Sequence, residues 1–226
     1  MILVDDRSKD YDLIPEVGLS IYLELNENAI LFDVNSSWGI VEENARKLGV
    51  ELSRVNAIVI SHWHEDHVGG LRGAMYYFKY ELRKNIPIYS PIEVDLENVI
   101  VTYKGMKIME HIYSTGPLGY IVKEQSLVID TPQGSLIIIG CNHPGLELVV
   151  NTALEITKSK VFGIIGGLHI DDDEDINKVL HIIKTFDIEI VGPAHCTSNN
   201  ALKVLSCKLK HNLIDMYTGR VLVLEF

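Results

Sequence analysis

Short apolar segments separated by turn residues dominate the first sixty residues. Residues 19–25 and 29–34 are mostly apolar on either side of Asn26-Glu27-Asn28, a pattern typical of a β-hairpin. Apolar side chains then recur at helical spacing over residues 39–48, and Gly49 follows where helices commonly end. Residues 55–60 are apolar except for Asn56, which indicates a buried strand. The pattern therefore predicts two strands, a helix and a third strand.

The rest of the chain changes its pattern twice. A helical pattern over residues 71–84 precedes short strands predicted over 86–89, 99–103, 106–112, 120–122 and 126–130. Strands predicted over 135–139, 161–165 and 188–191 then alternate with helices predicted over 146–158, 173–186 and 198–210, and a last strand is predicted over 220–226. Strand meanders between βα units favour an α+β or α/β fold in which two mixed sheets pack together with helices outside.

Composition favours one folded domain over residues 1–226. The chain is 47% hydrophobic, which is enough to bury a core, and no linker or repeat divides it. Its net charge of -11 argues against affinity based on nucleic-acid phosphates or anionic lipid. We therefore expect a small-molecule ligand rather than a nucleic-acid or membrane partner, and the composition leaves the oligomeric state open.

Three other features of the sequence predict a cytoplasmic protein. The first residues lack the basic and apolar regions of a signal peptide. No apolar run approaches the roughly 20 residues that a bilayer span requires. Three cysteines are too few for a disulfide framework, which fits a reducing compartment.

Residues 62–67 concentrate groups that bind metals. Nine histidines in 226 residues would place about a quarter of one histidine in six residues, but this segment holds three and an aspartate. In an extended loop, His62 and His64 point to the same side and can bind one cation. Asp66 and His67 follow one turn later and can serve a second position. Imidazole with carboxylate predicts one or two divalent transition-metal ions, zinc first, with manganese, iron or magnesium as alternatives.

Other histidines and cysteines follow later in the chain. One histidine comes after each of three predicted strands: His143, His169 and His195. Ligands at the carboxyl ends of strands are expected to meet at one edge of a sheet. The remaining three histidines lack such a context and are expected to be surface or structural residues: His111, His181 and His211. Cys141 and Cys196 are interpreted either as small buried side chains or as soft ligands or redox-sensitive neighbours of the histidines.

The signature H-x-H-x-D-H at residues 62–67 resembles that of the metallo-β-lactamase superfamily. Within that superfamily the chain is similar to archaeal 7,8-dihydropterin-6-methyl-4-(β-D-ribofuranosyl)aminobenzene 5′-phosphate synthases and related hydrolases. The stretches that carry the similarity are Gly18–Tyr22, Leu31–Asp33, Ile60–Gly70, Gly140–Gly145, Gly166–His169 and Pro193–Thr197. The resemblance implies a four-layer αββα sandwich with a metal site at its edge.

The resemblance also implies a role for individual residues. It assigns three residues to a first metal position: His62, His64 and His143. It assigns three to a second position: Asp66, His67 and His195. Asp33, at a predicted strand end, would orient a ligand imidazole, although a turn cap is the alternative interpretation.

His169 departs from the family pattern. In most dinuclear members an aspartate at this place bridges both metals, whereas an imidazole would hold them beyond the about 3.5–4 Å of hydrolytic two-metal sites. We therefore expect His169 to be a terminal ligand or a substrate contact, and the two metal positions to differ in affinity. The acidic residues 171–175 suit the first turn of the following helix better than a metal site.

The expected activity is hydrolysis of a small anionic ester, lactone or phosphoester by a metal-activated hydroxide. Asp66 would accept a hydrogen bond from the attacking water, while His169 and Thr197 are candidates for contacting an anionic substrate. A pterin-handling synthase that acts on a phosphorylated pterin is the alternative. A non-hydrolytic redox or sensing protein is a second alternative.

Overall fold

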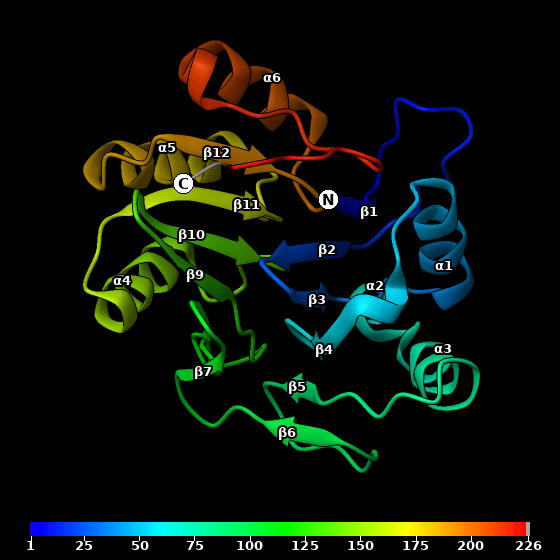
Figure 1. Ribbon diagram of the computed structural model, residues 1–226. Coiled ribbons are helices and arrows are strands. Elements are labelled where there is room, and N and C mark those ends of the chain that lie inside the picture. Colours follow the sequence, from blue (N-terminus) through cyan, green and yellow to red (C-terminus); the bar gives the residue numbers. More distant parts are fainter. Residues whose placement is uncertain (225–226) are drawn as a thin grey trace. The chain divides into compact units, whose positions relative to one another are not determined.

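The computed structural model describes residues 1–224, which form two compact units. Residues 1–102 and 217–224 form the first unit, and residues 103–216 belong to the second. Each unit contains one mixed six-stranded sheet, and Figure 1 labels the strands and helices. The expectation of one domain over the whole chain stays a prediction. Within residues 1–224, no helix has the length and apolar character that a bilayer crossing demands.

The sheet of the first unit follows the order of the sequence. Its strands are β1 (Ile2–Val4), β2 (Ser20–Leu25), β3 (Asn28–Phe32), β4 (Val55–Val59), β5 (Ile88–Ser90) and β6 (Val99–Val101). Pairing is antiparallel from β1 to β3 and parallel from β3 to β6. The β2–β3 turn contains Asn26 with φ of 58°, a left-handed conformation that asparagine tolerates. The predicted hairpin is therefore confirmed.

Helices of the first unit cover one face of this sheet. They are α1 (Trp38–Lys47), α2 (Glu65–Val68) and α3 (Leu71–Tyr76), with a 3₁₀ turn over Leu52–Arg54 and a π-helical turn over Tyr77–Glu81. Val41 of α1 and Leu71 of α3 pack in one buried cluster with Leu31 of β3 and Ile58 of β4. This packing holds the carboxyl ends of β3 and β4 in place.

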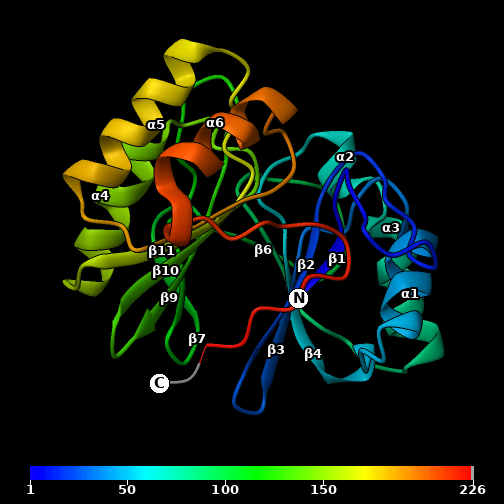
Figure 2. The same ribbon diagram turned by 90° about the horizontal axis from the view of Figure 1, so that it is seen from above.

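The second unit has a sheet of order β12-β11-β10-β9-β8-β7. Its strands are β7 (Met106–Met109), β8 (Ile112–Ser114), β9 (Leu127–Thr131), β10 (Gly134–Ile139), β11 (Val161–Gly166) and β12 (Ile190–Pro193). β10, β11 and β12 are parallel neighbours, so their carboxyl ends share one edge. Three helices of this unit are labelled in Figure 2: α4 (Leu146–Thr157), α5 (Asp173–Thr185) and α6 (Asn199–Leu209). Their buried apolar side chains pack with those of the sheet in one cluster.

The predicted helices of the last third are confirmed to within one or two residues. The acidic run begins α5 as expected, because Asp172 accepts hydrogen bonds at 2.9 and 3.0 Å from the backbone N–H groups of Glu174 and Asp175. A short 3₁₀ turn over Lys210–Asn212 follows α6.

Several predicted strands are wrong. The run over residues 106–112 is a hairpin, because the chain turns at Glu110 and at His111, whose φ is 61°. Residues 120–122 form an exposed loop, closed by a bridge between Leu118 and Glu124. Residues 220–224 form no strand, and the end of that prediction, residues 225–226, lies outside the described residues. β1 was not predicted, and the predicted helix over 71–84 becomes α3 and the π-helical turn.

Candidate metal centre

The carboxylate of Asp33 organises the loop that follows β4. Because β3 and β4 are parallel neighbours, Asp33, directly after β3, lies beside Ser61 in the loop after β4. Asp33 is fully buried, and its Oδ1 accepts a 2.6 Å hydrogen bond from the Ser61 backbone N–H. Its Oδ2 accepts from the Ser61 hydroxyl and from Nδ1 of His67, each at 2.7 Å. One carboxylate therefore holds both the beginning of the loop and the imidazole of His67 in α2, the helix that follows it.

These hydrogen bonds determine which nitrogen keeps a lone pair in two of the imidazoles. A carboxylate can only accept, so the Ser61 hydroxyl donates to Asp33 and accepts from Nδ1 of His62, 2.9 Å away. His67 likewise donates its Nδ1 hydrogen to Asp33. Both rings therefore present Nε2 as an electron-pair donor, which is the form of imidazole that binds a metal.

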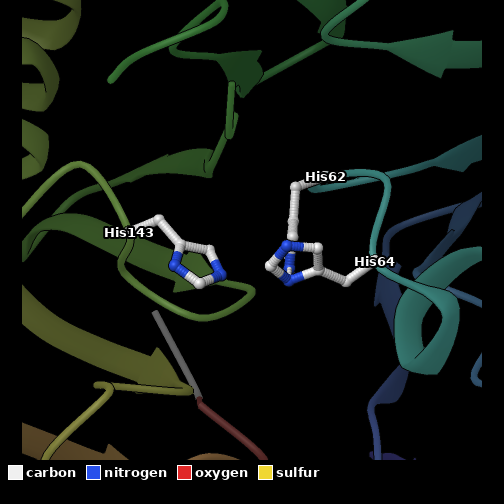
Figure 3. Close-up of side chains that lie close together, drawn as sticks. All are labelled: His62, His64 and His143. Atoms are coloured by element: carbon white, nitrogen blue, oxygen red, sulfur yellow. Dashed lines mark hydrogen bonds between the residues drawn. The ribbon is translucent and has the colours of Figure 1, made fainter. Parts of the chain in front are cut away.

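His62 and His64 bring two nitrogens to the separation that one metal ion requires. Nε2 of His62 lies 3.1 Å from Nδ1 of His64, and Figure 3 shows the two rings together at the end of the same loop. Two nitrogen ligands on a tetrahedral zinc ion, with bonds of about 2.0–2.1 Å, are about 3.3 Å apart. His62 is fully buried and His64 is exposed, so the pair reaches from the interior to solvent. The residues therefore fit a metal of the kind that the motif predicts.

Asp66 lies near the second nitrogen of His67. Its Oδ2 is 3.8 Å from Nε2 of His67, whereas Asp33 contacts Nδ1 of the same ring. The Leu19 backbone N–H donates to the Asp66 carbonyl at 3.2 Å and holds the turn. The Asp66 side chain is 32% exposed, so this carboxylate is accessible to water. The first unit thus places an oxygen donor and a nitrogen donor close together.

Buried Glu124 shapes the loop after β10 in the second unit. Its side chain is 1% exposed. Oε1 accepts hydrogen bonds at 2.9 Å from the backbone N–H groups of Cys141 and Asn142, and Oε2 accepts one at 2.8 Å from His143. Three successive N–H groups on one carboxylate fix the backbone of this loop. Glu124 therefore positions His143.

The second unit carries histidines at the ends of three neighbouring strands. His143 follows β10, His169 follows β11 and His195 follows β12. Ligand atoms of Cys141, His143 and His169 lie within 4.8 Å of one another, as do those of Cys141, His195 and Cys196. Figure 3 includes His143, in the loop after β10. The second unit thus brings nitrogen and sulfur donors together by itself.

His169 and Thr197 differ in their surroundings. The His169 side chain is 49% exposed, with φ of 46° and its Nε2 3.9 Å from Asp171 Oδ2. The Thr197 hydroxyl is buried and has no hydrogen-bond partner among the described residues. A buried hydroxyl of this kind is a candidate for contacting a bound anion.

Two contributors were missed in the sequence. Ser61 stands next to the histidine motif, and a hydroxyl directly after a strand was a usable signal. Glu124 lies between the strands predicted over 120–122 and 126–130, and nothing local connected it with His143. The three histidines that were expected to be surface or structural residues are exposed: His111, His181 and His211.

The family model of the metallo-β-lactamase superfamily matches residues 13–155, more than half of the chain. The chain therefore belongs to the metallo-β-lactamase superfamily, and its two mixed six-stranded sheets with their helices have the αββα fold that the resemblance implied. Membership supports a metal-dependent, hydrolase-type enzyme that binds divalent metal.

Individual relatives agree with this assignment. The chain is 24% identical over 265 residues to the 7,8-dihydropterin-6-methyl-4-(β-D-ribofuranosyl)-aminobenzene-5′-phosphate synthase of Methanocaldococcus jannaschii, covering 91% of this chain and 89% of that protein. Tm1679, a metal-dependent hydrolase of the β-lactamase superfamily, superposes with a TM-score of 0.81 at 23% identity, over 100% of this chain and 98% of Tm1679. YhfI from Bacillus subtilis, a metallo-β-lactamase fold protein, gives a TM-score of 0.67 at 11% identity, over 95% and 94% of the two chains.

Proposed function

We propose that the protein is a metal-dependent hydrolase of a small anionic ester, lactone or phosphoester. One observation carries the proposal: His62 donates its Nδ1 hydrogen to Ser61, His67 donates its Nδ1 hydrogen to Asp33, and both rings therefore present Nε2 as an electron-pair donor. A metal site needs imidazoles that are held in this form, whereas an isolated structural histidine has no such requirement.

The proposed ligands follow the family pattern. We assign His62, His64 and His143 to one ion. We assign Asp66, His67 and His195 to the other. Zinc is the proposed metal, with manganese, iron or magnesium as alternatives, and the two positions are proposed to differ in affinity because His169 replaces a bridging carboxylate.

The chain's own residues supply the remaining chemistry. A divalent ion bound here would lower the pKa of a coordinated water to about 7 and so supply hydroxide at neutral pH. The accessible Asp66 carboxylate accepts a hydrogen bond from the attacking water and orients it. His169 and the Thr197 hydroxyl donate hydrogen bonds to the anionic group of the substrate. The net charge of -11 supports a small ligand rather than nucleic acid or a membrane.

A second candidate is a synthase that acts on a phosphorylated dihydropterin. It is favoured by the similarity to the archaeal synthase, which extends over 91% of this chain. The same metal ligands would serve it, with His169 and Thr197 contacting the phosphate.

Metal analysis combined with turnover tests both candidates. Protein purified without added metal or chelator is analysed for metal and, after reconstitution, assayed on bis(p-nitrophenyl) phosphate, lactones and a phosphorylated dihydropterin. We expect bound divalent metal and hydrolysis in the wild type, loss of both in His64→Ala, and neither loss in His181→Ala, whose histidine is exposed on α5.

The outcomes separate the alternatives. Metal and turnover that persist in His64→Ala would refute the proposed site. Turnover of the pterin alone would support the synthase. Bound iron with visible absorption and no turnover of any of these compounds would favour a redox or sensing protein.

A further inference from the structure

Two cysteines meet at the edge of the second unit's sheet. Cys141 stands in the loop after β10 and Cys196 in the loop after β12, 55 residues apart in sequence. Their Sγ atoms are 3.1 Å apart, and Cys196 Sγ also lies 3.8 Å from the Cys141 carbonyl oxygen. Neither cysteine forms a disulfide in the structure. The two thiols are therefore in direct contact.

Glycine at the end of β11 makes this contact possible. β11 lies between β10 and β12, so the two loops must meet across its end. A Cβ at Gly167 would lie 2.7 Å from Cys196 Sγ and 2.2 Å from the Gly140 carbonyl oxygen. Any side chain at Gly167 would therefore collide with the sulfur of Cys196 and with the backbone just before Cys141.

Closing the bond requires a small but defined movement. A disulfide has an S–S length of about 2.05 Å, so the sulfurs must approach each other by about 1 Å. Each loop also carries a proposed metal ligand, His143 in one and His195 in the other. Functional metal–ligand distances are held within about 0.2 Å, so a movement of this size disturbs the ligands.

We propose that Cys141 and Cys196 form a peroxide-sensitive dithiol whose oxidation to a disulfide weakens metal binding by the histidines on the same two loops. The disulfide itself follows from the contact of the sulfurs, whereas its effect on the metal rests on the proposed function. Cys196 is the more accessible of the two, since Cys141 is only 4% exposed.

Hydrogen peroxide is the oxidant. The sulfur of Cys196 attacks the O–O bond, which breaks to give a sulfenic acid and one water. The sulfur of Cys141 then attacks the sulfenic sulfur and releases a second water. The two thiol hydrogens leave in the waters, the sulfurs together lose two electrons, and the peroxide oxygens gain them. A dithiol reductant reverses the reaction.

The test uses the full chain, reduced, freed of reductant and treated with a small excess of hydrogen peroxide. We expect the wild type to lose two of its three thiols and about 2 Da of mass, with a Cys141–Cys196 linked peptide after digestion. Cys207→Ser is the matched control, because Cys207 is exposed on α6, and it should form the same link. Cys141→Ser and Cys196→Ser each keep one cysteine of the pair, and this cysteine should gain oxygen instead of forming the link.

Metal release is measured separately on the same samples. A chelator should remove metal about tenfold faster from the oxidised than from the reduced wild type, and equally fast from oxidised and reduced Cys196→Ser. Absence of the linked peptide, or equal oxidation of all three thiols, would overturn the dithiol. If the disulfide-linked protein retains its metal to the same extent as the reduced protein, the proposed effect of oxidation on metal binding is refuted. Reduced protein that binds no metal would refute the proposed function, while the linked peptide would still decide whether the disulfide forms.

Discussion

Replacing Glu124 by glutamine tests how the loop of His143 is held. Glutamine keeps nearly the same shape but loses the charge, and only one of its two terminal atoms can accept a hydrogen bond. Its oxygen can still accept from Cys141 and Asn142, while its NH₂ group replaces the oxygen that lies 2.8 Å from the His143 N–H. A donor then faces a donor at a site that is 1% exposed.

The magnitude follows from these three bonds. A hydrogen bond to a charged group contributes about 1.5–3 kcal/mol, and a neutral one about 1 kcal/mol. Loss of one charged bond and weakening of two others to the neutral value therefore cost about 2.5–7 kcal/mol of loop stability. Because each 1.4 kcal/mol is about a factor of ten, the three amides should exchange with deuterium at least about fiftyfold faster.

Hydrogen exchange followed by mass spectrometry measures this effect on the peptide that contains residues 141–143. Glu155→Gln is the matched control, since Glu155 is exposed on α4 and its replacement should change stability by less than about 0.5 kcal/mol. Metal retention in Glu124→Gln should fall together with the exchange protection. Unchanged exchange in Glu124→Gln would show that the carboxylate does not hold the loop, and would refute the reasoning.

Three further results are expected. Asp66→Asn should retain part of the metal and lose most turnover, so a fully active variant would contradict the water-orienting role of Asp66. Gly18→Ala should destabilise the chain by at least about 3 kcal/mol in urea unfolding, because Gly18 has φ of 121° and a Cβ there would lie 2.1 Å from the Asp66 carbonyl oxygen; a value near zero would contradict this packing. Burial, reinforced by Glu24, raises the pKa of Tyr22 to about 12. The folded chain thus holds the phenol proton more tightly than the unfolded chain, so Tyr22 contributes stability that is present below pH 10 and lost as the pH rises towards 12. From pH 9 to 12, the free energy of unfolding should decline less steeply with pH in Tyr22→Phe than in the wild type. Equal slopes would contradict the raised pKa of Tyr22.

Local pattern was sufficient for the regular elements of the fold. Alternating and helical spacings placed the β2–β3 hairpin and helices α4, α5 and α6 close to their observed bounds. The local pattern failed where apolar residues are not buried. Tyr120 and Ile121 resemble part of a strand but lie in a loop, where they are 100% and 98% exposed. No periodicity distinguishes such a loop from a strand, because the difference is whether another strand lies beside it.

The histidine motif was evident in the sequence because its residues lie within six positions, in the loop after β4 and the first turn of α2, where side chains close in sequence are also close in space. The buried carboxylates that hold the histidines and their loops come from distant segments of the sequence, so only the tertiary structure identified them. Asp33 reaches Ser61 and His67 because β3 and β4 are parallel neighbours, and Glu124 reaches His143 across 19 residues. Sequence alone thus determined which chemistry the chain can support. Strand order and register decided which buried carboxylates hold the imidazoles, because a hydrogen bond depends on positions in space that separation along the chain does not specify.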